Sequence, residues 1–211
     1  MKQPRNYAFI DSQNLHLGVS NDVINKKGRK IYAGQLLDYR KFRNYLREKY
    51  NVKRAYIFIG FIPTNNRLYS YLQEAGYTIV FKTISTYVDE DGEVQTKGNV
   101  DTDIVLYAAA VLAGEYDKAV FVSGDGDFLS LYKYLDDQGK LDKILVPNRH
   151  RYSKLLNEYR SQLRFVSDLK SLHRPIKKTR SGDRSATLGL PSHGDTKSIA
   201  KQPKNSKGTK A

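Results

Sequence analysis

The chain contains no cysteine, so a disulfide framework and a thiolate metal site are both excluded, and nothing points to an oxidising compartment. It also lacks any run of about 18 apolar residues, the length that a membrane-spanning helix needs. No signal peptide is evident, because Asp11 follows only four residues of strand-like sequence. We therefore expect a cytoplasmic protein with no membrane partner.

Motifs for covalent catalysis are missing as well. No Gly-x-Ser-x-Gly motif occurs and a Cys-His pair is impossible, so nucleophilic acyl transfer has no support. The pair Gly124-x-Gly126 is followed by Leu129 where a dinucleotide-binding motif needs its third glycine. The histidines lack the spacing of metal ligands; they are His16, His150, His173 and His193. The remaining candidates for chemistry are carboxylates, amides and lysines.

Positive charge is in excess, with 36 Lys and Arg against 22 Asp and Glu and a formal net charge of +14. Residues 175–211 hold 9 Lys or Arg and 2 Asp, so half of the net charge lies there and half in residues 1–174. This balance favours polyanions such as nucleic acid or anionic lipid, although solubility alone is an alternative explanation. Because residues 175–211 contain no Tyr or Phe, we predict one domain over 1–174 and a disordered basic tail.

Short β-rich runs alternate with segments of helical period throughout residues 1–174. This alternation predicts parallel strands joined by crossover helices, that is, an α/β protein with a three-layer α/β/α sandwich and a central, mostly parallel sheet. One stretch, 84–96, instead predicts a hairpin that turns at Asp91-Gly92. The predicted strands are 7–10, 54–59, 78–82, 118–122, 143–146 and 163–166, and the predicted helices are 38–50, 66–75, 101–113, 127–137 and 152–158.

Four aspartates stand at the ends of these elements. Asp11 follows the first strand, Asp125 and Asp127 follow the strand at 118–122, and Asp101 opens a helix. Ligands bind outside the carboxyl ends of parallel strands, so these acids converge if the two strands are neighbours. Carboxylates packed that closely raise one another's pKa, and a divalent cation keeps them ionised. The pattern therefore predicts a metal site.

Helical geometry favours Asp101 over Asp103 as the acid that faces the site. At about 100° per residue, Asp101 lies at the centre of the apolar stripe of its helix, and Asp103 lies on the opposite side. That stripe comprises Ile104, Val105, Ala108 and Leu112. Helix N-capping is the alternative explanation for Asp101 and for Asp127, because Asp is a preferred capping residue.

Oxygen ligands without Cys or His suit Mg²⁺ or Mn²⁺ and disfavour zinc. Such ions activate water for the displacement of a phosphoryl group. Lys97, four residues before Asp101, is placed to neutralise a phosphate, or else is a surface lysine paired with an acid. Asn14, three residues after Asp11, either supports the site or satisfies backbone groups of its loop.

Three segments carry a family resemblance, namely residues 9–15 (FIDSQNL), 97–101 (KGNVD) and 122–128 (VSGDGDF). Together they resemble the NYN domain, a branch of the PIN-like nucleases. The resemblance covers about residues 5–172 and implies a Rossmann-like fold with a metal-dependent ribonuclease site. It implies that hydrolysis leaves a 5′-phosphate and a 3′-hydroxyl. The acids it places in the site are Asp11, Asp101, Asp125 and Asp127, and the supporting residues are Asn14, Lys97 and Ser123.

The same motifs show one departure from the family pattern and leave two rival interpretations. Asn99 interrupts the middle motif and Asp103 offers a second acid nearby, so the choice between Asp101 and Asp103 stays open. The Gly124–Asp127 segment also resembles the last metal motif of haloacid-dehalogenase-like phosphatases, but Gln13 stands where those enzymes need their second acid. A catalytically silent RNA-binding or scaffold protein of the same fold is the non-enzymatic alternative.

The predicted partner is RNA, single-stranded by expectation. Some of the 16 tyrosines, all of which precede residue 160, are candidates to stack bases, although most are expected in the core. The sequence leaves the oligomeric state open, a homodimer included. The basic residues expected to follow the RNA backbone are Lys26, Lys27, Arg29, Lys30 and Arg67.

Overall fold

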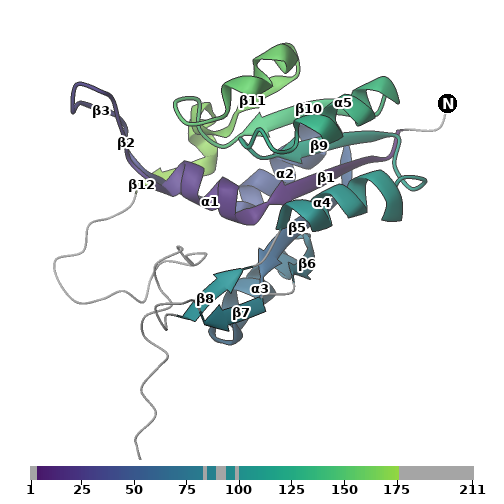
Figure 1. Ribbon diagram of the computed structural model, residues 1–211, viewed down its shortest axis with the longest axis horizontal. Helices are drawn as coiled ribbons and strands as arrows, with labels where there is room; N and C mark the ends of the chain where they lie inside the picture. The colour runs from purple at the N-terminus through teal and green to yellow at the C-terminus, as the bar shows by residue number, and fades with distance from the viewer. Residues whose placement is uncertain (1–3, 83–84, 89–93, 98–99, 176–211) are drawn as a thin grey trace, which may run out of the picture.

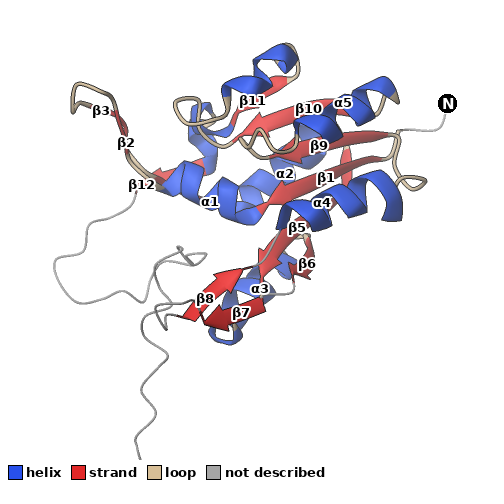
Figure 2. Cartoon of the chain, in the orientation of Figure 1, coloured by secondary structure: helices blue, strands red, loops and turns tan. Residues whose placement is uncertain are grey.

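A computed structural model of the chain describes residues 4–82, 85–88, 94–97 and 100–175. Its centre is a six-stranded sheet in the order β11-β10-β9-β1-β5-β6, and all five pairings are parallel. Helices lie on both faces of this sheet (Figure 2), so the predicted α/β/α architecture is confirmed. The strands are β1 (Asn6–Asp11), β5 (Val52–Gly60), β6 (Thr78–Lys82), β9 (Lys118–Val122), β10 (Leu141–Val146) and β11 (Leu163–Phe165).

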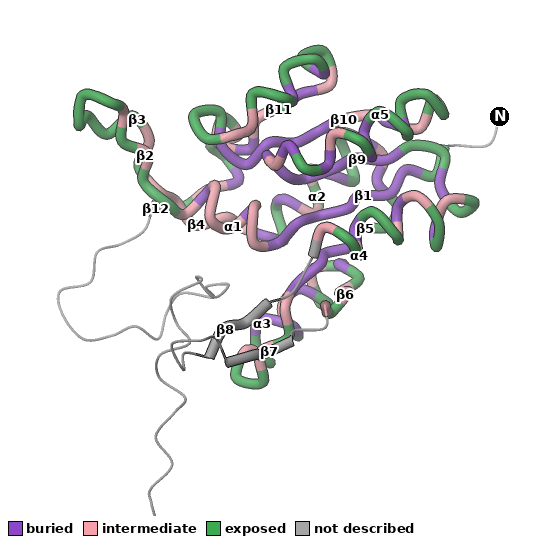
Figure 3. Tube along the Cα trace, viewed as in Figure 1, coloured by how far each residue is buried: buried purple, intermediate pink, exposed green. Residues whose placement is uncertain are grey.

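Two hydrophobic cores lie on the two faces of the sheet. On β1, Ala8 and Ile10 face the core under helices α1 (Ser12–Ser20), α2 (Tyr39–Tyr50) and α3 (Asn66–Glu74). Tyr7 and Phe9 face the core under α4 (Val100–Leu106) and α5 (Leu129–Asp137). This alternation follows from the two-residue period of a strand. Figure 3 shows that the central strands β1, β9 and β10 are buried along most of their length, as expected of a sheet covered on both faces.

The strand order creates a topological switch point between β1 and β9. The chain moves outward from β1 through β5 to β6, then returns to β9 and moves outward the other way through β10 and β11. β1 and β9 pair in register, with Ile10 opposite Val122. Ligands of open parallel sheets bind at such a point, outside the carboxyl ends of the strands. The adjacency that brings Asp11 and Asp125 to one edge is therefore present.

Several helices differ from their prediction. The predicted helix 101–113 is α4 followed by a π-helical segment, η2 (Tyr107–Val111), and the stripe residue Val105 is 38% exposed. α5 begins at Leu129, two residues later than predicted, and the helix predicted at 152–158 is the 3-10 helix η3 (Lys154–Tyr159). α1 was not predicted, because its Asn, His, Gly, Val and Ser residues are poor helix formers. It forms because Asp11 caps it and Leu15 and Val19 are buried.

Short elements complete the fold. β2 (Val23–Ile24) and β3 (Lys30–Tyr32) form a hairpin, which extends away from the body of the fold in Figure 1, and β4 (Gln35–Leu37) pairs with β12 (His173–Pro175). None of these was predicted. The predicted hairpin is present as β7 (Ser85–Val88) and β8 (Val94–Lys97), which are antiparallel, although its turn lies outside the described residues. The remaining 3-10 helices are η1 (Pro63–Asn65), η4 (Val166–Asp168) and η5 (Lys170–Leu172).

The predicted tail lies outside the described residues except for Pro175, which belongs to β12. The described fold therefore reaches one residue beyond the predicted boundary. Among the helices of the described residues, none has the length and apolarity needed to cross a membrane.

Candidate functional site

A pocket of about 220 Å³ opens at the carboxyl edge of the sheet, at the switch point. Its walls come from the end of β1, the first turns of α1, the end of β6, the first turn of α4 and the loop after β9. Most of the side chains that line it are polar: Asp11, Gln13, Asn14, Leu17, Lys82, Asp101 and Asp125. Four of the sequence-predicted site residues thus share one cavity.

Asp11 is the most deeply buried of the pocket acids, with 6% of its surface exposed. It ends β1 and caps α1, and its Oδ1 accepts a hydrogen bond of 3.0 Å from the backbone N–H of Asn14. Its pKa is raised to about 6, mainly by burial and also by the nearby charges of Asp101 and Asp125, while the backbone hydrogen bond from Asn14 acts in the opposite direction. A buried carboxylate with two acidic neighbours is the situation that a bound cation relieves.

Asp101 lies in the first turn of α4 and is half-buried. Burial and then the charges of Asp125 and Asp127 raise its pKa, while Lys82 lowers it. The helix begins at Val100, so Asp101 stands inside it and the N-cap explanation does not hold. Asp103 is not among the pocket-lining residues, although its charge acts on Lys82. The geometry therefore favours Asp101 over Asp103 as the pocket acid.

The loop 123–127 is held by predicted supporting residues. The Oδ1 of Asn14 accepts a hydrogen bond of 2.8 Å from the backbone N–H of Gly124, which ties α1 to the loop after β9. Ser123 is buried, and its Oγ accepts from the N–H of Asp125 at 3.2 Å. The Oδ1 of Asp125 in turn accepts from the N–H of Asp127 at 3.0 Å. These bonds fix the backbone on which Asp125 is presented to the pocket.

Gly126 has a steric reason to be glycine. A Cβ built at this position would collide with the Oγ of Ser153, on the loop that follows β10. The N–H of Ser153 also donates to the carbonyl of Gly124 at 2.9 Å. The acidic loop and the β10–η3 loop therefore pack directly against each other.

Asp127 differs from the other three acids. It is exposed and does not line the pocket, but its charge contributes to the raised pKa of Asp101. It is not the N-cap of α5 either, because that position is occupied by Phe128. Its carboxylate is thus close to the site without forming part of its wall.

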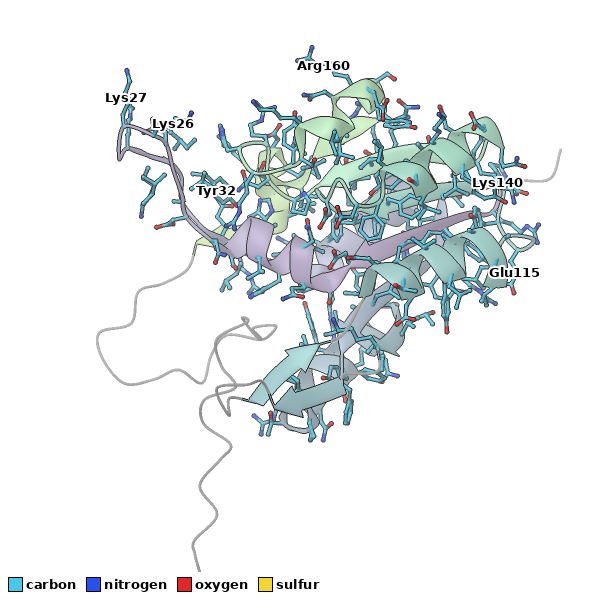
Figure 4. The ribbon with its side chains drawn as sticks, in the orientation of Figure 1. Lys26, Lys27, Tyr32, Glu115, Lys140 and Arg160 are labelled. Atoms are coloured by element: carbon cyan, nitrogen blue, oxygen red, sulfur yellow. The ribbon has the colours of Figure 1, made fainter. Side chains whose placement is uncertain are left out.

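Other predicted residues lie elsewhere. Lys97 is the last residue of β8, and its side chain lies outside the part of the structure that is described. Arg67 is exposed near the start of α3 and does not line the pocket. Lys26, Lys27, Arg29 and Lys30 belong to the β2–β3 hairpin, at the far end of α1 from Asp11, where Figure 4 labels Lys26 and Lys27 at the tip.

Lys82 and Gln13 line the pocket but were not predicted as site residues. Burial lowers the pKa of Lys82, and the charges of Asp11, Asp101 and Asp103 oppose that shift. Lys82 ends β6 as Asp11 ends β1, so the strand-end rule that selected Asp11 also applies to it. Gln13 occupies the position of the second acid in the phosphatase motif, which leaves that motif without its acid in the assembled pocket.

The ligand atoms that the pocket offers are carboxylate and amide oxygens, which is the chemistry that a hard cation prefers. Within the described residues, no three His, Cys, Asp or Glu side chains stand together at the spacing of a formed metal site. The described pocket therefore gathers oxygen donors of the right chemistry, but it does not hold three acidic side chains at ligand spacing.

Comparison with known proteins places these observations in a family. The model of the NYN domain matches residues 6–163. A crystal structure of a protein of unknown function from Vibrio parahaemolyticus is similar, with a TM-score of 0.57 and 22% sequence identity over 79% of this chain and 96% of that one. At that identity the likeness concerns the fold. A search of curated proteins gave no match.

Proposed function

Because the chain belongs to the NYN domain family, we propose that it is a metal-dependent ribonuclease that hydrolyses the phosphodiester bonds of RNA. The observation that carries the proposal is the meeting of Asp11, Asp101 and Asp125 in one pocket at the switch point of the sheet. These acids come from three distant segments of the chain. A structural role for any one of them does not explain their convergence, because like charges in a partly buried pocket oppose folding.

The proposed holders of Mg²⁺ or Mn²⁺, directly or through water, are the pocket acids Asp11, Asp101 and Asp125 and the exposed Asp127. When bound, such an ion lowers the pKa of water and stabilises the charge that develops on the phosphoryl oxygens. Asn14 and Ser123 act as positioning residues, because their hydrogen bonds fix the backbone of Gly124 and Asp125.

Lys82 is the proposed phosphate contact within the pocket, since it is the cation among the lining side chains. Lys97 remains a second candidate, because its strand pairs with β7 and leads into the segment before α4. An ammonium at this edge offsets the negative charge that the acids would otherwise present to a phosphate. It thereby makes an acidic pocket compatible with an anionic substrate.

Cleavage of labelled single-stranded RNA in the presence of Mn²⁺ tests the proposal. We expect the wild-type chain to produce fragments with 5′-phosphates, and Asp11→Asn and Asp125→Asn to lose at least about 100-fold in rate, the usual cost of removing one group that stabilises transition-state charge. Asp137→Asn is the matched control, because Asp137 is an exposed aspartate at the end of α5, away from the pocket.

Three results would contradict the proposal. RNA binding without metal-dependent cleavage would indicate a silent binding or scaffold protein of the same fold. Release of inorganic phosphate from small monoesters, without internal cuts in RNA, would indicate a phosphatase. Equal loss of cleavage in Asp137→Asn and in the pocket variants would indicate damage to the fold or a contaminating nuclease.

A further inference from the structure

Three aromatic rings meet where β5 and β6 end. Phe61 and Phe81 are large apolar side chains with 49% and 45% of their surface exposed. Their ring centroids lie 5.3 Å apart in an edge-on arrangement, and both rings contact Tyr69 of α3, at 6.0 Å and 4.8 Å. We call Phe61, Phe81 and Tyr69 the aromatic platform.

Tyr69 holds the platform in place. It is buried, and its hydroxyl accepts a hydrogen bond of 2.7 Å from the backbone N–H of Ile62. The same hydroxyl lies 3.2 Å from the carbonyl oxygens of Gly60 and Ile62, either of which accepts its proton. The segment that carries Phe61 is therefore anchored on both sides. Two half-exposed rings on an anchored support offer a stacking surface without a large loss of side-chain freedom.

The platform adjoins the pocket through β6. Phe81 immediately precedes Lys82, which lines the pocket, and consecutive Cα atoms are about 3.8 Å apart. The two side chains point to opposite faces of the strand because side chains alternate. β6 is the outermost strand of the sheet, so a chain that crosses the end of this strand contacts Lys82 on one side and the rings on the other.

The charge around the platform suits a polyanion. Between Phe61 and Lys82 the sequence holds two cations, Arg67 and Lys82, and one acid, Glu74. The Oε2 of Glu74 lies 2.8 Å from a guanidinium nitrogen of Arg40, so its charge is offset. Exposed apolar side chains at the edge of a sheet are usually avoided, because they promote aggregation, so two exposed rings in contact beside a pocket are a candidate ligand contact.

We propose that the aromatic platform stacks an unpaired base of a single-stranded nucleic acid whose phosphate backbone enters the pocket at Lys82. Stacking on aromatic rings is the general way in which proteins hold unpaired bases, and it tolerates any sequence because every base has a π-face. A duplex has its bases already stacked, so the platform selects single strands. The inference rests on the proposed nuclease function for the meaning of the pocket, but its own test needs no catalysis.

Binding measured in metal-free buffer with a chelator tests the proposal. The probes are a short fluorescent single-stranded RNA and the same backbone with its bases removed. We expect Phe61→Ala and Phe81→Ala to weaken binding of the intact RNA about 5- to 150-fold, the range found for one base that stacks on an aromatic ring. Binding of the abasic probe should be unchanged. Tyr134→Ala is the matched control, because Tyr134 is an aromatic residue of α5 that is also 49% exposed.

The outcomes distinguish failure of the aromatic-platform proposal from failure of the nuclease proposal. Equal affinity of wild type and both Phe variants for intact RNA overturns the platform, even if wild type cleaves RNA. A Phe-dependent preference for intact over abasic RNA supports it, even if no cleavage occurs, in which case the nuclease proposal fails alone. Sedimentation that shows a wild-type dimer, separated into monomers by Phe61→Ala without a change in RNA affinity, also overturns it and assigns the rings to contact with a second copy.

Discussion

The acidic pocket and the β2–β3 hairpin both gather several charges of the same sign, but they do so in different surroundings. The pocket places Asp11, 6% exposed, beside Asp101 and Asp125, and the pKa of Asp11 rises to about 6. The hairpin carries Lys26, Lys27, Arg29 and Lys30 on exposed positions, and Lys30 is paired with Asp22. Water and salt screen exposed charges, whereas burial removes that screening.

The comparison shows where like charges lower the stability of the fold. Like charges on an exposed hairpin require no compensation, so the β2–β3 cations are compatible with a purely solvated role. Like charges in a partly buried pocket reduce stability unless a cation offsets them, and such clusters are typical of functional sites. Substitutions in the pocket should therefore change stability and activity strongly, and substitutions in the hairpin weakly.

The largest effect on stability is expected from Asp11→Asn in metal-free protein. The folded-state pKa of about 6 lies above the ordinary value of 3.8, so ionisation of Asp11 opposes folding. That penalty is absent below about pH 4, grows between about pH 4 and 6, and is complete above, where the difference between the two pKa values corresponds to about 3 kcal/mol. Asn retains the capping acceptor for α1. Asp11→Asn should thus be more stable than wild type at neutral pH.

Urea unfolding at pH 4 and pH 7.5 in a chelator measures this difference. The stability of Asp11→Asn relative to wild type should be about 2–3 kcal/mol greater at pH 7.5 than at pH 4. An equal difference at both pH values would mean that burial does not disfavour the ionised form of Asp11, and the contrast between pocket and hairpin would lose its basis.

A slightly smaller effect is expected from divalent metal. Addition of Mn²⁺ or Mg²⁺ at 100 times its dissociation constant should stabilise the wild type by about 2.7 kcal/mol, or about 5–10 °C in Tm for a chain of this size. Asp125→Asn should lose most of this shift, because it removes a pocket carboxylate. Replacement of the hairpin cations, as in Lys26→Ala with Lys27→Ala, should leave the shift intact. If Asp125→Asn showed the full metal-induced rise in Tm, the metal would have to bind outside the pocket.

Lys82→Gln should lower kcat/KM for RNA about tenfold or more, since a hydrogen bond to a charged group is worth about 1.5–3 kcal/mol. Lys118→Gln is the control, because Lys118 is an exposed lysine at the start of β9, at the opposite edge of the sheet. Lys97→Gln measured beside them decides which lysine meets the phosphate. A loss confined to Lys97→Gln would remove Lys82 from the proposed mechanism.

The smallest effect is expected from the hairpin itself. Each phosphate that a protein neutralises on a single strand adds about 0.7 to the slope of log affinity against log salt. Removing Lys26 and Lys27 should therefore change RNA affinity only at low salt, with a slope reduced by at most about 1.4. Titration of binding against salt measures it. A large fall in affinity at physiological salt would show that the hairpin belongs to the binding site.

Much of the fold follows from the sequence, because buried strands contain continuous apolar runs, such as Ala55–Ile59 in β5 and Ala119–Val122 in β9. β6 and β9 coincide with their predicted ranges, Thr78–Lys82 and Lys118–Val122. α1 was missed because its stability comes from burial of Leu15 and Val19 and from the cap at Asp11, not from propensity. β2, β3, β4 and β12 were missed because pairs of two or three residues leave almost no periodic signal.

The pocket was predictable in its acids but not in its cation. Asp11 and Asp125 are visible in the sequence as charges at or just after the ends of buried strands, helical geometry points to Asp101, and the motif resemblance supports Asp101 and Asn14 as well. The strand-end rule applies to Lys82 as well, but a lysine at the end of a strand is common on surfaces, so the rule alone does not distinguish it from a solvated lysine. In the folded sheet its charge acts on Asp101. The aromatic platform depends on contacts between β5, β6 and α3 that no local pattern encodes.

The bond between Asn14 and Gly124 gives the pocket an internal reporter. The N–H of Gly124 donates to the Oδ1 of Asn14, a side chain 110 residues away in sequence, rather than to a neighbouring strand. Hydrogen–deuterium exchange of the Gly124 amide therefore reports the breaking of this one hydrogen bond and not the separation of the strands of the sheet. A single amide signal can thus record whether metal or nucleic acid tightens the contact between α1 and the loop after β9.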